Sequence, residues 1–276
     1  MTESNYDLAV AYRIYPKVSK TPPIYADDKL KLSEICLKSL INSLDNLKVK
    51  FWIILDNCPS VYMDMFKKYI PNENLELINL DGAGNAKTFG KQMDILLVQN
   101  DSEYVYFAED DYFYLPKQFG LMLEFMKKNN GVHFVTPYNH PDYYEYHLHN
   151  YKYDTKQFLD KNWRTGATTC MTFLTTKTIL QNTENTFKTY TKNNYDTSVW
   201  LSLTKYKLSN PFNLVKYVFT DKRMAKAFIK GWLHNWKQII FGKKWMLWVP
   251  VPSIATHMDS KHLAPSINWA EEFKKI

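Results

Sequence analysis

The sequence predicts an α/β protein with a mostly parallel central sheet flanked by helices. In the first half, short apolar runs rich in strand-forming residues alternate with segments whose apolar residues recur at helical spacing. Polar residues and glycines follow several of these strands, where ligands of open parallel sheets bind. Hydrophobic residues make up 45% of the 276 residues, enough for a large core, and the second half is less regular.

The first elements follow a strand-helix-strand order. A strand is expected over residues 7–15 (DLAVAYRIY), and a helix over residues 27–44 follows it. Asp27 or Asp28 is placed to cap the start of this helix. Residues 49–59 (VKFWIILDNCP) form a continuous apolar run closed by Asp-Asn and Pro, which is typical of a buried strand.

The alternation continues to the middle of the chain. We expect helices over residues 60–70 and 86–99 and strands over residues 75–85 and 103–111. The strand at 75–85 ends in the glycine turn DGAGN, which equally fits an ordinary turn or a close approach to a ligand. Pro116 suits the first turn of a helix that runs to Met126.

The second half contains weaker signals. Strands are expected over residues 131–138 and 168–176, with a polar, Tyr-rich loop between them, and a helix over residues 195–207. There is no internal repeat and no clear linker. We therefore predict a single domain over residues 1–276, with one lobe at 1–130 and a second at 131–276.

Composition excludes several classes of protein. Aromatic residues reach 16%, which a disordered chain would lack. The three cysteines are widely spaced without zinc-site spacing, which favours a reducing compartment. The polar N-terminus does not resemble a signal peptide, and no apolar run reaches the roughly 20 residues of a membrane span. We expect a cytoplasmic protein.

The net charge of +7 is concentrated in a basic, Trp-rich segment at residues 222–250. Between Asp221 and Trp248 there are seven Lys or Arg residues and one acidic residue, Asp221. The segment also holds Trp232, Trp236 and Trp245. Lys and Trp on one amphipathic helix suit an anionic membrane surface, which would give a peripheral membrane location. A core-packing helix with a solvated basic face is an equal alternative. No motif supports nucleic-acid binding.

Three adjacent carboxylates, Glu109, Asp110 and Asp111, close the strand at 103–111. An isolated acidic triplet is more often a solvated turn. Strand alternation would place Glu109 and Asp111 on one face, where they repel each other unless a cation lies between them. Mg²⁺ or Mn²⁺ binds one or two carboxylates together with phosphate oxygens and water. This arrangement fits a nucleotide-diphosphate ligand, with Asp111 and Glu109 as candidate metal ligands.

The ordered set of strand ends resembles the GT-A-fold glycosyltransferases, especially those of the family 2 type. The set consists of Asp56, the DGAGN turn and the EDD variant of an acidic DxD motif, and the resemblance extends from about Asp7 to Phe125. It implies that residues 1–130 bind a nucleotide-sugar and that the second lobe binds the acceptor. It also implies Asp56 at the base, Tyr12 and Arg13 beside base and phosphate, Asp110 at the ribose and Asp111 on the metal. The family carries an arginine further along the next helix, and Lys87 or Lys91 is the candidate to replace it here.

For the acceptor side, the resemblance implies a catalytic carboxylate at the start of a helix. Asp196 in NNYDTSVW has this place, although an Asp there equally suits a helix N-cap. Arg164 in NWRTGATTC falls in the segment that shapes the sugar pocket. His147 and His149 lack a third partner for a metal site.

Near the C-terminus, His257 has the place of the family's histidine metal ligand, though a lone histidine is as often structural. Lys261 or His262 would then contact the phosphates.

The sequence thus predicts a Mn²⁺- or Mg²⁺-dependent, inverting glycosyltransferase that uses a nucleotide-diphosphate sugar donor and a glycan or lipid-linked glycan acceptor. The alternatives are a nucleotidyltransferase, which normally needs a Gly-rich loop that AYRIYPKVSK lacks, and a non-enzymatic glycan- or membrane-binding module.

Overall fold

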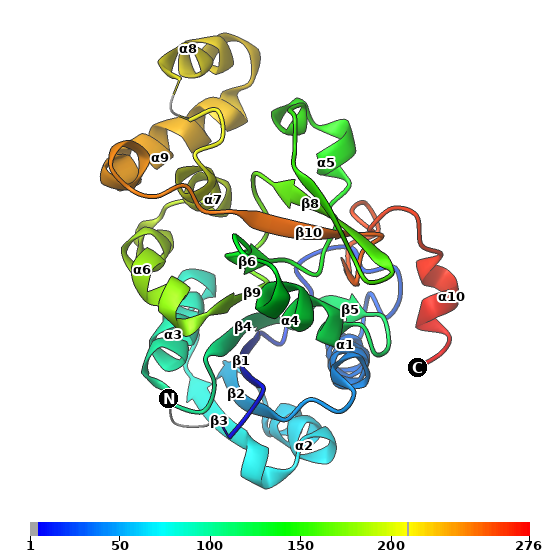
Figure 1. Cartoon of the computed structure of the whole chain (residues 1–276). Coiled ribbons are helices and arrows are strands. Elements are labelled where there is room, and N and C mark those ends of the chain that lie inside the picture. Colours follow the sequence, from blue (N-terminus) through cyan, green and yellow to red (C-terminus); the bar gives the residue numbers. More distant parts are fainter. Residues whose placement is uncertain (1–4, 209) are drawn as a thin grey trace.

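The computed structural model describes residues 5–208 and 210–276 (Figure 1). Its strands form one large sheet in the order β3-β2-β1-β4-β9-β6-β10-β8-β7 and a small sheet of β11 and β5. The strands are β1 (Leu8–Ile14), β2 (Val49–Asp56), β3 (Leu75–Leu80), β4 (Tyr104–Glu109), β5 (Tyr112–Tyr114), β6 (Phe134–Val135), β7 (Thr155–Phe158), β8 (Lys161–Gly166), β9 (Phe173–Thr176), β10 (Leu247–Val251) and β11 (Ala255–His257). The α-helices are α1 (Lys29–Leu44), α2 (Ser60–Tyr69), α3 (Asn85–Val98), α4 (Phe119–Lys128), α5 (Asp142–Glu145), α6 (Lys177–Phe187), α7 (Asp196–Thr204), α8 (Pro211–Thr220), α9 (Lys222–Ile240) and α10 (Trp269–Phe273).

The sheet is mostly parallel, as the sequence predicts. β3, β2, β1 and β4 are parallel neighbours, and β6 and β10 also pair in parallel. β9 and β8 run antiparallel to the strands beside them. Strands from both halves of the chain therefore share one sheet, and the division into lobes at residue 130 stays a prediction.

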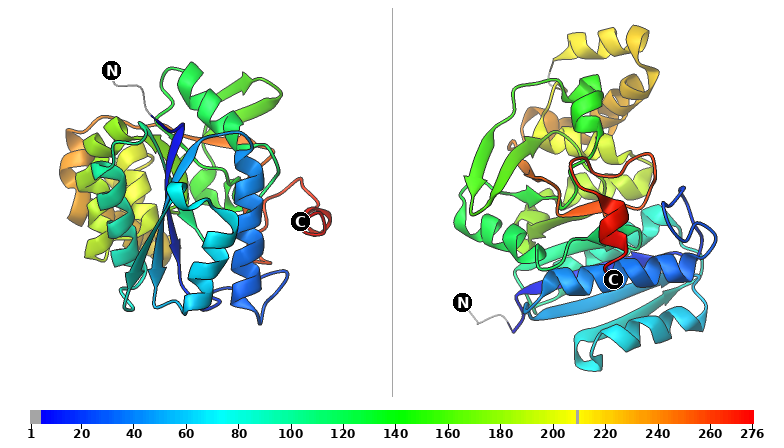
Figure 2. Two further views of the ribbon diagram at one scale, coloured as in Figure 1. Left: turned by 90° about the horizontal axis from the view of Figure 1, so that it is seen from below. Right: turned by 90° about the vertical axis from the view of Figure 1, so that its right-hand side faces the viewer.

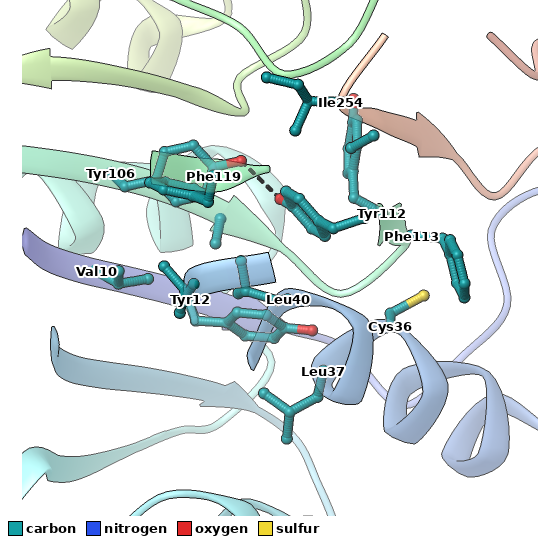
Figure 3. Packing of buried hydrophobic residues seen from close by; sticks show 14 of the residues in the cluster. Val10, Tyr12, Cys36, Leu37, Leu40, Tyr106, Tyr112, Phe113, Phe119 and Ile254 are labelled. Atoms are coloured by element: carbon teal, nitrogen blue, oxygen red, sulfur yellow. Dashed lines mark hydrogen bonds between the residues drawn. The ribbon is translucent and has the colours of Figure 1, made fainter. Parts of the chain in front are cut away.

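Helices cover both faces of the sheet, because alternate residues of its inner strands face two separate cores. Leu8, Val10 and Tyr12 of β1 pack with α1 and α4, whereas Ala9 and Ala11 pack with α3, α6 and α7. Figure 2 (left) shows α1 on one side of the sheet and α3 on the other. Figure 3 shows the first core, in which Tyr12 lies beside the residues of α1.

The predicted strands and helices of the first half are confirmed in their order, and two of them begin or end elsewhere than predicted. Asp28 caps α1 by accepting a hydrogen bond from the amide of Lys31 at 3.0 Å. β4, however, ends at Glu109, and the chain turns at Asp110 and Asp111 before entering β5. The strand alternation expected over residues 109–111 is therefore wrong. β5 leaves the large sheet to pair with β11, and this turn sends the three carboxylates in different directions.

The second half departs further from the sequence prediction. The hairpin of β7 and β8 and helix α6 were not expected, and β6 covers two residues of the strand predicted at 131–138. α4 begins at Phe119, after a turn in which Lys117 has a positive φ of 58°, rather than at Pro116. Short strands of this kind are specified by their neighbours in the sheet more than by their own periodicity.

Candidate active site

The candidate site lies at the carboxyl ends of β1, β2 and β4, where Arg13, Asp56 and Glu109 are placed. A cavity of about 640 Å³ lies at the opposite edge of the sheet, between Tyr6 and Val49. Ligands of open parallel sheets bind outside the carboxyl ends of the strands. We therefore place the candidate site at the carboxyl edge of the sheet and not in this cavity at the other edge.

Arg13 and Glu109 are cross-strand partners in the register of β1 and β4, and their side chains form an ion pair. The second oxygen of Glu109 accepts a hydrogen bond from the hydroxyl of Thr172 at 2.6 Å. Arg13 also donates to the backbone oxygen of Asn85 at 2.8 Å, at the start of α3. Burial alone would lower the pKa of Arg13, but the adjacent Glu109 carboxylate outweighs it and raises this pKa. Arg13 is 6% exposed. Through its bonds to Glu109 and Asn85, it joins β1 to β4 and to the start of α3.

Lys29, the first residue of α1, forms an ion pair of 2.7 Å with Asp110. Asp110 also accepts a hydrogen bond from the amide of Tyr15 at 3.3 Å. Burial raises the pKa of the Asp110 carboxyl, Lys29 opposes this rise, and the neighbouring charge of Asp111 adds to it. Asp110 thus joins the end of β1 to the start of α1. Its predicted contact with a ribose stays a prediction.

Asp111 faces His257 at the end of β11, with 3.1 Å between Oδ2 and Nε2. The pairing of β11 with β5 sets this distance, because His257 lies opposite Tyr112 in their register. Burial would raise the pKa of Asp111, yet the charge and hydrogen bond of His257 lower it to about 2. Correspondingly, Asp111 outweighs the effect of burial on His257 and raises the pKa of the imidazole. The structure brings together two residues that are 146 positions apart, and their role as a metal pair stays a prediction.

Asp56 holds the glycine turn that the sequence singled out. Its two oxygens accept hydrogen bonds from the amides of Ala83 at 2.6 Å and Gly84 at 2.8 Å. Gly84 has a φ of 81°, which favours glycine, and precedes the first residue of α3. Asp56 is 2% exposed. Asp56 therefore holds the glycine turn in place, and its contact with a nucleotide base stays a prediction.

Several other predicted residues lie apart from the three ion pairs. Tyr12 does not line the edge as expected, because strand alternation turns it away from Arg13 and buries it in the core at 1% exposure. Lys87 is exposed on the first turn of α3, and Lys261 is exposed after β11. His262 is paired with Asp259 at 2.9 Å. Their contacts with phosphates stay predictions.

Arg164 is buried on β8 at 4% exposure among aromatic rings. Its guanidinium carbon lies 3.8 Å from the ring centroid of Tyr153, with Tyr143 and Tyr144 at 5.3 and 5.5 Å. The structure thus places Arg164 within an aromatic surround, and its role in a sugar pocket stays a prediction.

Asp196 is the first residue of α7 and lies in the wall of a cavity of about 440 Å³. Its Oδ1 accepts hydrogen bonds from the amide of Thr197 at 2.6 Å and from its hydroxyl at 3.2 Å. Among the described residues, none donates to Oδ2. Burial raises the pKa of Asp196, the bonds from Thr197 oppose the rise, and the charge of Glu109 adds to it. The N-cap position belongs to Tyr195, and the role of Asp196 as a base stays a prediction.

Burial raises the pKa of the Cys170 thiol to about 12, and the charges of Asp196, Glu109 and Asp111 add to the rise. Neither Cys170 nor Lys29 was identified from the sequence, because nothing in their local patterns signals a site.

The candidate ligands for a divalent cation are Glu109, Asp111 and His257. In the part of the chain that the structure describes, no group of three or more His, Cys, Asp or Glu side chains is arranged to hold a metal ion. Both oxygens of Glu109 are engaged by Arg13 and Thr172, so its expected role as a ligand does not fit. Asp111 and His257 remain as one carboxylate and one imidazole. This pair fits a cation whose other ligands are phosphate oxygens and water.

No family model matches the chain, and no curated protein matches its sequence. Solved structures similar to it include a mannosyltransferase from Pyrobaculum calidifontis in complex with GDP-Man and Mn²⁺ (13% identity, 49% of this chain and 36% of that chain, TM-score 0.35). Others are TarS 1–349 of S. aureus (10% identity, 84% and 81%, 0.45) and a cytidylyltransferase from Leptospira borgpetersenii (13%, 66% and 64%, 0.36). The chain thus spans about a third of the mannosyltransferase.

Replacing Glu109 and Asp111 should separate their roles. Glu109→Gln leaves the buried Arg13 without a counter-charge, and an arginine cannot lose its proton, so we expect the free energy of unfolding to fall by about 3 kcal/mol. Asp111→Asn should cost about 1 kcal/mol or less, since His257 can become neutral. Urea denaturation at pH 8 measures both values. Equal losses for the two variants would contradict this assignment.

Proposed function

We propose that this protein is a metal-dependent glycosyltransferase that moves a sugar from a nucleotide-diphosphate donor to a glycan or glycolipid acceptor. The observation that carries the proposal is the approach of Asp111 and His257 at the carboxyl edge of the sheet. The pair suits a cation bound to a diphosphate, and Asp196 suits an acceptor hydroxyl. A nucleotidyltransferase would not need the second group.

In the proposed reaction, the acceptor hydroxyl oxygen attacks the anomeric carbon of the donor sugar. The bond between that carbon and the diphosphate breaks, and the diphosphate leaves with the bonding electrons. Oδ2 of Asp196 takes the hydroxyl proton. Attack in line with the leaving group inverts the configuration at the anomeric carbon. A raised pKa makes Asp196 a stronger base than an ordinary aspartate. A bound Mn²⁺ or Mg²⁺ would neutralise the charge of the diphosphate.

The chain should bind nucleoside diphosphates in a metal-dependent way. Mn²⁺ together with the correct nucleotide at about 100 times Kd should stabilise the fold by about 2.7 kcal/mol. A thermal-shift screen of nucleoside diphosphates and nucleotide-sugars, with and without Mn²⁺, measures this. Asp111→Asn should abolish the Mn²⁺-dependent part, whereas Asp94→Asn, on the exposed side of α3, should retain it. The proposal is wrong if none of these compounds stabilises the wild type with metal.

Asp196→Asn should lower kcat by about 10²- to 10⁴-fold while leaving donor binding unchanged, because general-base catalysis contributes this much. In the wild type, kcat should fall as the pH decreases through the raised pKa of Asp196, where the base becomes protonated. Asp160→Asn, an exposed acidic residue after β7, is the matched control and should keep both kcat and the pH profile. An unchanged profile in Asp196→Asn would assign the base elsewhere.

We also propose that α9 attaches the protein to an anionic membrane surface. One face of α9 packs inward through residues such as Met224, Phe228 and Ile239. α9 is kinked at Asn235, and large apolar side chains are exposed on both sides of the kink: Ile229 and Leu233 before it and Trp236 and Ile240 after it, with Leu233 72% exposed. The helix therefore carries exposed apolar residues in addition to those that pack inward. In the described residues, no helix is long and apolar enough to cross a membrane.

The charges of this helix complement the same surface. Lys222, Lys226 and Lys237 are exposed. Along the helix, each is within about two turns of an exposed apolar residue of α9. α8 adds Phe212 and Phe219, which are 79% and 85% exposed. Lysines beside exposed aromatic and aliphatic residues favour lipid headgroups with negative charge.

Leu233→Ser with Trp236→Ser should weaken binding to phosphatidylglycerol vesicles at least about tenfold, because two large apolar side chains no longer enter the interface. Co-sedimentation with these vesicles and with phosphatidylcholine vesicles measures binding. Val98→Ser, which removes an exposed residue at the end of α3, should bind like the wild type. Equal binding of both variants to anionic vesicles would exclude α9 as the attachment site.

A further inference from the structure

The cavity beside Asp196 has a wall with unusual charge. It has a volume of about 440 Å³ and lies between α5, the start of α7 and the start of α9. In Figure 1, α5, α7 and α9 lie in the upper half of the picture. Lys222, Arg223 and Lys226 all line it from α9. The cavity therefore places three cations next to the carboxylate that we propose as the base.

These cations have no anionic partner in the described part of the chain. None of them forms an ion pair there, although Asp221 next to them is engaged by Tyr146, by His147 and by the amides of α9. The charge of Arg223 opposes the rise that burial causes in the pKa of Asp196. All three basic side chains are exposed, so a negatively charged ligand that enters the cavity can reach them.

The remaining lining residues do not supply that charge. Asp142 and Asp196 are the acidic residues of the wall, fewer than the three cations. His149 also lines the cavity, and its Nδ1 is buried without a hydrogen-bond partner. The ring is 6% exposed. Burial lowers its pKa to about 3, so it is a neutral group that a ligand can satisfy without changing the charge.

We infer that this cavity holds a negatively charged group of the acceptor, a phosphate or a carboxylate, which Arg223 and its two neighbouring lysines bind. The acceptor hydroxyl then lies beside Asp196. The transfer step of this inference rests on the proposed function, whereas binding of the anion does not. Arg223 suits the task because a guanidinium binds either group with two parallel hydrogen bonds.

Three sugars of one size separate the possible anions. Glucose, glucuronate and glucose 6-phosphate are titrated against the whole chain by isothermal titration calorimetry without metal or nucleotide. We expect glucuronate or glucose 6-phosphate to bind at least about tenfold more tightly than glucose, as for a hydrogen-bonded charge pair. The tighter of the two identifies the carboxylate or the phosphate as the group bound.

Variants locate the binding. Arg223→Gln and Lys226→Gln should each weaken binding of the anionic sugar by about tenfold and leave glucose unchanged. Lys67→Gln, on the exposed side of α2, removes the same charge elsewhere and should bind like the wild type. Circular dichroism of each variant separates lost binding from lost fold.

Two results would overturn the inference. One is equal binding of glucose and both anionic sugars, or binding of none of them. The other is a loss of UDP binding with Mn²⁺ in Arg223→Gln, which would make the cavity part of the donor site. Anion binding in a protein that no nucleotide stabilises would instead leave this inference standing and refute the glycosyltransferase proposal.

Discussion

The site depends on giving each of three adjacent carboxylates its own cation. Glu109 pairs with Arg13 of β1, Asp110 with Lys29 of α1, and Asp111 with His257 of β11. The turn after β4 makes this possible, because a continuing strand would keep two of the three side chains on one face. The mutual repulsion of the acids is thus turned into contacts that join β4 to β1, to α1 and to the C-terminal sheet.

The three pairs differ in what they permit. Arg13 keeps its charge at any pH a protein meets, so its pair with Glu109 is a fixed part of the framework. His257 can release its proton, so its pair with Asp111 can open to another positive charge without leaving an ion buried alone. Glu109 therefore supports the framework of the site, whereas Asp111 and His257 can exchange partners. The sequence alone does not show this difference, because the three acids are adjacent and similar.

The regular part of the fold was predictable from sequence, because the strands and helices of the first half carry clear periodicity and caps. Asp28 at α1 and the strand end at Asp56 are examples. The pairing of Asp111 with His257 was expected through family resemblance. Lys29 was not predictable, since its role follows from the packing of α1 beside the end of β1. The end of β4 at Glu109 was missed for a related reason: the pairing of β5 with the distant β11, not a local signal, turns the chain.

The order of strands in the sheet has a consequence for how the protein is made. β10 lies between β6 and β8, and His257 follows soon after it, so an interior strand and one of the three cations come from late in the chain. During synthesis, the EDD segment emerges nearly 150 residues before its last partner. A nascent chain therefore carries Asp111 without its partner and an open sheet edge, and domains with such long-range pairings fold slowly. The three pairs are complete only when β11 has taken its place beside β5.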